Sequence, residues 1–210
     1  MLYINSYSIL NEHRVLLNGE LLTFPTDDSS HFLTHIYKGL GIEYPKFFKM
    51  DDLCKGGFVA SELLLRPLNL TLDEVRTDWA VVSFSSTSSL DTDIHYQSTI
   101  QSPEEYYPSP SVFVYTLANI MVGEVAIRHK IQGETSSFIL PNFDAKSIVE
   151  VTNLILSRNK SLSKILCVWA DCLKGHLDIA MWLLSNEAQS GAVPFDVSQL
   201  INSKNKIISR

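Results

Sequence analysis

The chain has 210 residues, 45% of them hydrophobic, and a formal net charge of −6. This length suffices for one domain with a sizeable core, and the mildly acidic balance gives no electrostatic reason to expect a nucleic-acid partner. No apolar run approaches the ~20 residues of a membrane helix, so no membrane partner is expected. The first residues lack the pattern of a signal peptide, and the three cysteines make no disulfide framework, so the sequence predicts a cytoplasmic location.

The first third of the chain predicts a strand, a hairpin and two helices. Asn18-Gly19 is a turn signal typical of a β-hairpin, and the polar cluster of residues 26–30 is typical of a helix start. Pro67 stops the second helix, because proline cannot continue the hydrogen-bond ladder. The predicted elements are a strand over residues 2–9, a hairpin within residues 11–26, and helices over residues 31–40 and 52–66.

The rest of the chain alternates strand-like apolar runs with helical segments. Near-continuous apolar runs indicate strands that are buried on both faces of a sheet. The alternation predicts an α/β fold, with a central, mostly parallel mixed sheet and helices on both faces, over a single domain of residues 1–201 with a polar, fraying tail at 202–210. The predicted strands cover residues 79–84, 135–140, 165–169 and 179–184, and the predicted helices cover residues 91–101, 116–131 and 144–159.

Helix caps and turns complete this interpretation. Asp91 is expected to cap the helix of residues 91–101, and Asp144 or Asn142 the helix of residues 144–159. The helix of residues 116–131 ends in three cations, which suit the negative end of a helix dipole. Gly133 follows it, at a place where a positive φ is often needed. Residues 171–176 predict a polar turn after a buried strand.

The segment from Ser109 to Asn142 also carries a family resemblance. It contains a Ser-Pro…Phe element, an asparagine on the predicted helix and two glycines, namely Ser109, Pro110, Phe113, Asn119, Gly123 and Gly133. In these residues the segment resembles the middle of the N-terminal half of β-ketoacyl synthases, which are members of the thiolase-like fold. The Lys49-Met50-Asp51 element before a long helix is similar to one in the same family. The resemblance covers nearly all of this sequence but only about half of the family fold.

The resemblance implies that the catalytic machinery of the family is missing. The family's nucleophilic cysteine would fall at or near Asn142, and the amide of an asparagine cannot form a thioester. The family's two catalytic histidines lie in the C-terminal half, which the resemblance does not reach. It therefore implies a catalytically silent, chain-length-factor-like subunit. Such a subunit would pair with an active β-ketoacyl synthase in fatty acid or polyketide biosynthesis, as in aryl polyene or flexirubin-type pathways.

The resemblance also assigns candidate contacts. In the ketosynthase dimer the corresponding strand pairs with its mate across a two-fold axis, so the edge strand is expected to be a dimer interface. Arg128 and Lys130 suit an acyl carrier protein because such carriers are acidic, and no cofactor or metal is implied. The candidate interface residues are Thr135, Ser136, Ser137, Phe138, Ile139 and Leu140, and the candidate acyl-pocket or carrier-protein contacts are Phe113, Asn119, Arg128 and Lys130.

Two other classes of function stay open. An enzyme would use Asn142 or a cysteine for acyl transfer or malonyl decarboxylation. A stand-alone homodimer would bind an acyl group or an acyl carrier protein without chemistry. The three cysteines, Cys54, Cys167 and Cys172, are expected to be buried packing residues without a neighbouring base.

The histidines offer a weaker candidate site. His31 and His35 lie four residues apart, so they share a helix face and form a candidate metal pair. No third ligand follows nearby in the sequence, and an exposed or packing pair is the preferred interpretation.

Overall fold

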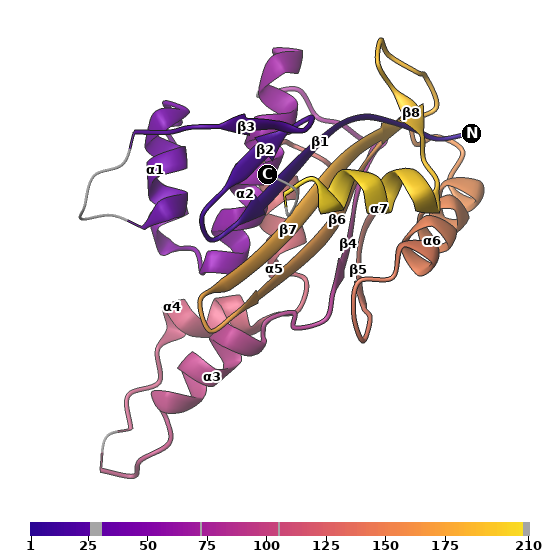
Figure 1. Ribbon diagram of the computed structural model, residues 1–210. Coiled ribbons are helices and arrows are strands. Elements are labelled where there is room, and N and C mark those ends of the chain that lie inside the picture. The colour runs from indigo at the N-terminus through magenta and orange to yellow at the C-terminus, as the bar shows by residue number, and fades with distance from the viewer. Residues whose placement is uncertain (26–30, 72, 105, 208–210) are drawn as a thin grey trace.

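The computed structural model describes residues 1–25, 31–71, 73–104 and 106–207, and within them the chain is built around one eight-stranded sheet (Figure 1). The strand order is β3-β2-β1-β7-β6-β4-β5, with β8 paired to β1. β4 is parallel to β5 and β6, whereas β7 is antiparallel to β6 and β1, so β1, β4, β5 and β6 share one direction. The strands are β1 (Tyr3–Asn11), β2 (Val15–Leu17), β3 (Glu20–Leu22), β4 (Trp79–Ser85), β5 (Thr135–Ile139), β6 (Lys164–Leu173), β7 (His176–Ser185) and β8 (Val193–Pro194).

Helices cover both faces of this sheet (Figure 1). Successive strand residues point to opposite faces, so Val81 and Leu166 enter one core while Val82 and Cys167 enter the other. One face packs against α1 (Phe32–Gly39), α2 (Asp52–Leu65) and α5 (Ile120–Arg128), and the other against α6 (Ala145–Arg158) and α7 (Val197–Asn205). The predicted α/β class, a mixed sheet between helices, is confirmed, but the sheet is not mostly parallel: β4 pairs in parallel with β5 and β6, and the other pairings are antiparallel. The long β6–β7 hairpin brings the chain straight back beside β6, so no crossover helix separates these two strands.

Helix α2 packs closely against strand β7 and helix α5 because it carries a glycine at each contact. A Cβ at Gly56 would lie 2.3 Å from Ile179 Cδ1, and one at Gly57 would lie 2.6 Å from Met121 Sδ. The helix begins where predicted, since the Asp51 carboxylate accepts a hydrogen bond from the Cys54 N–H at 2.8 Å. The 3₁₀ turns η1 (Pro45–Lys49) and η2 (Arg66–Leu68) flank it.

Most predicted elements are present with boundaries shifted by a few residues. The hairpin turn is confirmed, with positive φ angles of 53° at Asn18 and 83° at Gly19. The helix over residues 31–40 is observed as α1, whereas its predicted start signal, residues 26–30, lies outside the described residues.

The helix predicted over residues 116–131 is wrong in its first part. The chain forms α4 (Pro110–Phe113) and the 3₁₀ turn η3 (Val114–Thr116), becomes extended at Leu117, and starts α5 only at Ile120. The two helical pieces are bent by 97°. Leu117 is exposed in the bend, so its apolar side chain gains nothing from a continued helix.

Two smaller predictions also need correction. Ser89, not Asp91, precedes the helix α3 (Leu90–Ser98), and the Asp91 carboxylate instead accepts a hydrogen bond from the Lys174 N–H at 2.7 Å. Gly133 is required for space rather than for a positive φ, because a Cβ there would lie 2.2 Å from the Trp79 carbonyl oxygen. The positive φ occurs at Lys130, at 53°.

The expected fraying from residue 202 does not begin there. Residues 202–205 are the last turn of α7, and the Trp182 indole N–H donates to Ser203 Oγ at 2.8 Å in the core. The C-terminal helix is therefore anchored to the middle of the sheet.

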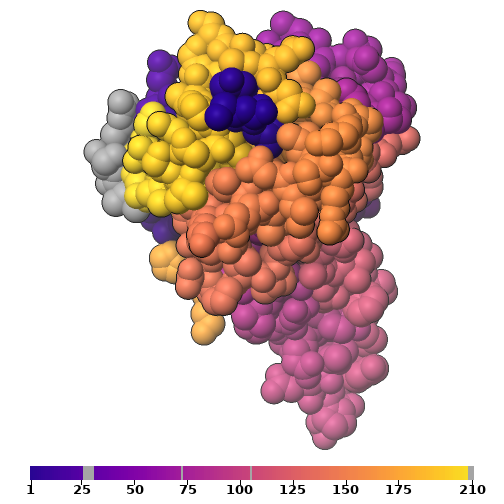
Figure 2. All heavy atoms as spheres, turned by 90° about the vertical axis from the view of Figure 1, so that its right-hand side faces the viewer, coloured from indigo at the N-terminus to yellow at the C-terminus, as the bar shows by residue number. Residues whose placement is uncertain are grey.

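One part of the molecule stands away from the sheet. Helices α3 and α4, with η3 and the chain that joins them, form an arm that projects from the body (Figures 1 and 2). Among the described residues no single helix is long and apolar enough to cross a membrane; the bent pair Pro110–Thr116 and Ile120–Arg128 passes that test by length and composition only.

Candidate functional site

The turn after β5 is where the sequence placed the missing nucleophile. Asn142 is exposed there, and its side chain makes no hydrogen bond to any other described residue. Helix α6 is capped by Asp144, whose carboxylate accepts from the Lys146 N–H at 3.1 Å and from Ser147 Oγ at 2.5 Å. The hydrogen bond from Ser147 is the main reason that the pKa of Asp144 lies below its usual range. Of the two predicted caps, Asp144 is the one that caps α6.

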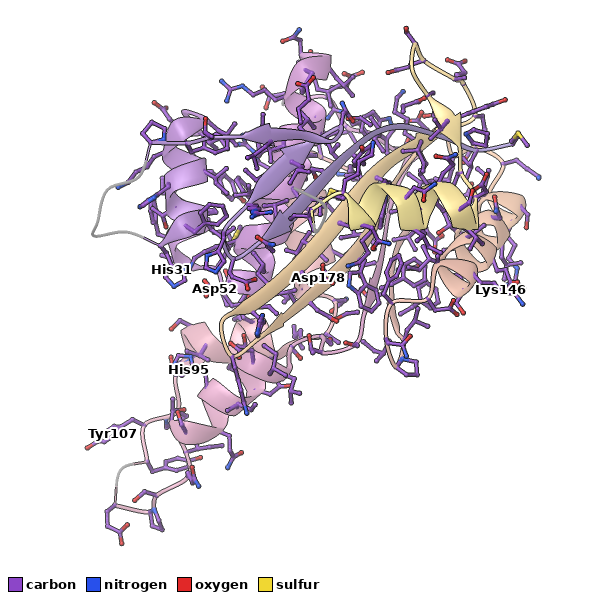
Figure 3. All side chains as sticks on the ribbon, in the orientation of Figure 1. His31, Asp52, His95, Tyr107, Lys146 and Asp178 are labelled. Atoms are coloured by element: carbon purple, nitrogen blue, oxygen red, sulfur yellow. The ribbon has the colours of Figure 1, made fainter. Side chains whose placement is uncertain are left out.

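The described side chains beside this turn form a packed and charge-paired cluster. The ring of Phe143 lies edge-on to the ring of Trp169, with centroids 5.4 Å apart. The Lys204 ammonium lies 5.0 Å from the centroid of the Phe143 ring. Lys204 is itself paired with Asp178 at 2.7 and 2.8 Å, and Asp178 also accepts from the Trp169 indole N–H at 3.0 Å. Asp178 on β7 and Lys146 on α6 are labelled in Figure 3. The cluster ties α7 to the sheet, and its charges neutralise each other.

The carboxyl ends of β4 and β6 meet at Asp171. Its carboxylate accepts from Ser85 Oγ (2.7 Å), from the N–H and Oγ of Ser86 (2.7 and 2.5 Å) and from the N–H of Thr87 (3.0 Å). Burial disfavours the charged form, but these hydrogen bonds outweigh it and hold the pKa of Asp171 below its usual range. Asp171 thus fixes the loop from which the arm departs, and it is a structural anchor rather than a catalytic base.

The cysteines are buried and protonated in this structure. All three are free and buried. Burial raises the pKa of Cys167 and of Cys172 to about 12, and burial followed by the charge of Asp51 raises that of Cys54 well above its usual value. A thiol with so high a pKa carries almost no thiolate at neutral pH. The expectation that these are packing residues is confirmed.

The predicted histidine pair is split by burial. His35 is buried on α1 while His31 is exposed at the start of that helix. Within the described part of the chain, no three His, Cys, Asp or Glu side chains come close enough to hold a metal ion.

Strand β5 is the last strand of the sheet, so one of its edges is open. The Val81 N–H donates to the Glu134 carbonyl and the Leu140 N–H to the Ser85 carbonyl, each at 2.9 Å. Alternate residues of a parallel strand face the same neighbour, so the even-numbered residues face β4. The N–H and C=O groups of Thr135, Ser137 and Ile139 consequently point to the open edge.

The four candidate pocket and carrier residues are not gathered in one place. Phe113 is 53% exposed on the arm, where its ring contacts Tyr96 at 5.3 Å. Asn119 is exposed at the bend before α5. Arg128 is committed to Glu62, with Nε 2.5 Å from the carboxylate, whereas Lys130 is exposed. The Glu62 contact was missed by sequence reasoning, since 66 residues separate the pair.

No family model and no curated protein matches the chain, but solved structures do. The ishigamide ketosynthase/chain length factor matches with a TM-score of 0.63 and 16% identity, over 88% of this chain and 62% of that one. The ketosynthase ApeO in complex with its chain length factor ApeC, from Xenorhabdus doucetiae, matches with a TM-score of 0.59 and 16% identity, over 89% of this chain and 79% of that one.

A β-ketoacyl synthase from Burkholderia phymatum STM815 matches with a TM-score of 0.57 and 11% identity, over 89% of this chain and 59% of that one. The chain spans less than two thirds of the length of the ishigamide and Burkholderia chains. Its fold is the thiolase-like fold of these ketosynthase and chain length factor structures.

Proposed function

We propose that this chain is a catalytically silent, chain-length-factor-like subunit that pairs with an active β-ketoacyl synthase in fatty acid or polyketide biosynthesis. The observation that carries the proposal is the open edge of β5, and an arm rich in exposed apolar side chains supports it. The neighbours of similar fold include a ketosynthase in complex with its chain length factor, which supports this kind of partner.

The edge of β5 is suited to pairing with another strand. Thr135, Ser137 and Ile139 offer backbone donors and acceptors along it, and the Ile139 side chain is 58% exposed. An open edge of this kind is a template for strand addition and is normally covered or blunted. No charged side chain and no proline lies within β5, so nothing in the strand prevents pairing.

The arm carries exposed apolar side chains of its own. Tyr107, labelled in Figure 3, is 76% exposed, and the other exposed apolar side chains of the arm and its bend are Leu90, Ile94, Tyr106, Phe113, Val114 and Leu117. A concentration of exposed apolar side chains on one part of a folded domain favours a site of interaction there. Phe113 and Asn119 lie on this surface, so a partner that covers the arm would bring them to the shared acyl pocket.

The state of the candidate nucleophiles supports the proposed catalytic silence. Asn142 carries an amide, the cysteines are buried with raised pKa values, and Lys204 is neutralised by Asp178. Condensation needs an activated nucleophile and donors for the developing oxyanion. We infer that any active site in the assembly is supplied by the partner subunit.

Contact with an acyl carrier protein would fall to Lys130. Its side chain is exposed at the end of α5, whereas the charge of Arg128 is already met by Glu62. An acidic carrier would be attracted to Lys130 at low ionic strength, and the attraction would weaken as salt is added.

A homodimer is the second candidate, because the edge of β5 can pair with a copy of itself. Co-expression distinguishes this homodimer from a complex with a ketosynthase. The chain is expressed with each complete ketosynthase encoded beside it and is purified on a tag that only one partner carries. We expect a one-to-one complex with a ketosynthase. A stable homodimer that binds none of these ketosynthases would contradict the proposal.

The enzymatic alternative is tested by intact mass. The purified complex would be incubated with malonyl- and acyl-loaded carrier protein. We expect acyl groups on the ketosynthase alone. An acyl adduct on this chain would refute the proposal that the chain is catalytically silent.

A further inference from the structure

A second polar site lies at the opposite end of β5 from Asn142. It is a groove of about 530 Å³ between the loop after α1, the ends of α2 and η2, and the last turn of α5. β5 spans roughly 16 Å, at about 3.3 Å per residue, so the groove is well separated from the Asn142 turn. Its lining includes two buried polar residues, Glu62 and His129, with Arg128 beside them.

The tautomer of His129 follows from its hydrogen bonds. Ser61 Oγ lies 2.7 Å from the Phe58 carbonyl oxygen and 2.8 Å from His129 Nε2. A carbonyl only accepts, so the single Ser61 hydroxyl proton points to Phe58. Ser61 Oγ must then accept a proton from His129, which places the hydrogen on Nε2. The Glu62 carboxylate, 3.9 Å from Nε2, favours the same arrangement.

His129 remains neutral in this position. Burial, followed by the charges of Arg128 and Arg76, lowers its pKa to about 3. Nδ1 is therefore a lone-pair acceptor at every physiological pH. It makes no hydrogen bond to another described residue, and His129 is one of the residues that line the groove.

Arg128 supplies the complementary donors. Its Nε donates to Glu62, and its guanidinium lies over the rings of Tyr44 and Phe58, with centroids at 5.2 and 5.6 Å. These contacts fix the guanidinium plane, and its two terminal nitrogens have no hydrogen-bond partner within the part of the chain that the structure describes. The groove thus presents fixed donors beside a fixed, uncharged acceptor.

The charge and lining of the groove narrow the ligand class. Glu43 and Glu62 balance Arg66 and Arg128, so the groove has no net charge to recruit an ion. Ile42, Leu65 and Leu70 add apolar surface. A secondary amide offers one N–H, one C=O and no charge, with carbon substituents on both sides. We propose that this groove binds a small ligand through a secondary amide, whose N–H donates to His129 Nδ1 and whose C=O accepts from Arg128.

The probe is N-acetyl-leucine methylamide, and its control is the analogue with every amide nitrogen methylated, which lacks N–H donors. The full-length protein, labelled with ¹⁵N in its histidines, is titrated with each and followed by NMR. His129 is assigned with the His129→Gln variant, or by sequential assignment if that variant does not fold. We expect Nε2 to carry the proton, and the Nδ1 resonance to move upfield saturably with the probe only.

Two variants check the donors. Arg128→Lys keeps the charge beside Glu62 but loses the fixed guanidinium, so it should weaken probe binding about tenfold or more, while Ile127→Ala, outside the groove, should not. The proposal is overturned if Nδ1 carries the proton, if the shift is absent or does not saturate, if the methylated analogue shifts Nδ1 equally, or if a folded Arg128→Lys variant binds as wild type does.

Discussion

The sharpest test of the proposed pairing is the substitution Ile139→Pro. Ile139 turns its backbone N–H to the open edge of β5, while the hydrogen bonds to β4 are made by its neighbours on either side. Proline removes the outward N–H and leaves the bonds to β4 in place, and edge strands tolerate proline in that orientation. The isolated chain should therefore fold, and only its pairing should suffer.

The size of the effect follows from one hydrogen bond. A backbone hydrogen bond contributes about 0.5–1.5 kcal/mol net, and a partner carbonyl left buried and unpaired costs about 1–3 kcal/mol. At about 1.4 kcal/mol per factor of ten, the affinity for a ketosynthase should fall by roughly tenfold to a hundredfold. A homodimer built across a two-fold axis would lose the bond twice and weaken further.

The matched control is Ile139→Thr, which keeps the N–H and the β-branched shape. Sedimentation velocity over a concentration series gives the dissociation constant of each variant, and thermal unfolding of the isolated chain checks the fold. If Ile139→Pro folds and pairs as tightly as Ile139→Thr, the edge of β5 is not the interface, and the proposal loses its main support.

Three further predictions follow from the site. Asp171→Asn should destabilise the fold by about 1–3 kcal/mol in urea unfolding at pH 7, because Ser86 Oγ loses its acceptor. Since folding lowers the pKa of Asp171, its contribution is present above the unfolded pKa and is lost as the pH falls through the folded value; the variant should therefore lose less stability than wild type on acidification below about pH 4. Phe113→Ala in the purified complex should lengthen the acyl products, measured by mass spectrometry, and unchanged lengths would exclude Phe113 from the pocket. Native-state iodoacetamide should label none of Cys54, Cys167 and Cys172 within the time that labels a denatured control fully, and rapid labelling of any of them would contradict its burial.

The sequence was informative where one physical effect dominated. The apolar runs of β4, β6 and β7 could be assigned because strands buried on both faces must be apolar throughout. The cap at Asp144 could be assigned because a carboxylate before an apolar helix stripe has few other uses. The open edge of β5 was also expected, although only through resemblance to a family.

The structural features that the sequence did not predict depend on contacts between residues far apart in the chain. The Asp171 carboxylate meets a loop about 85 residues earlier in the chain, and Ser61 meets His129 across 68 residues. Helical periodicity ran through Leu117, yet the chain bends there because the arm leaves the core and offers nothing to bury that side chain. Such features follow from the assembled sheet rather than from local pattern.

The turn after β5 bears on whether a cysteine placed at position 142 would be an activated nucleophile. A helix N-terminus lowers the pKa of a nearby thiol through its free N–H groups and positive potential. Here the Asp144 carboxylate occupies that position, and its lowered pKa keeps it charged at neutral pH. A thiolate at position 142 would therefore face a negative charge two residues away.

Asn142→Cys should accordingly give a thiol with a pKa at or above about 8.5, the value of a free cysteine. The matched double variant Asn142→Cys with Asp144→Asn keeps a side chain that can cap the helix but removes the charge, so its thiol pKa should be lower. The rate of iodoacetamide alkylation against pH, followed by intact mass, reports both values. A pKa well below 8 in the single variant would show that the Asp144 carboxylate does not cancel the helix field, and the proposed lack of chemistry would then rest on the side chain at position 142 alone.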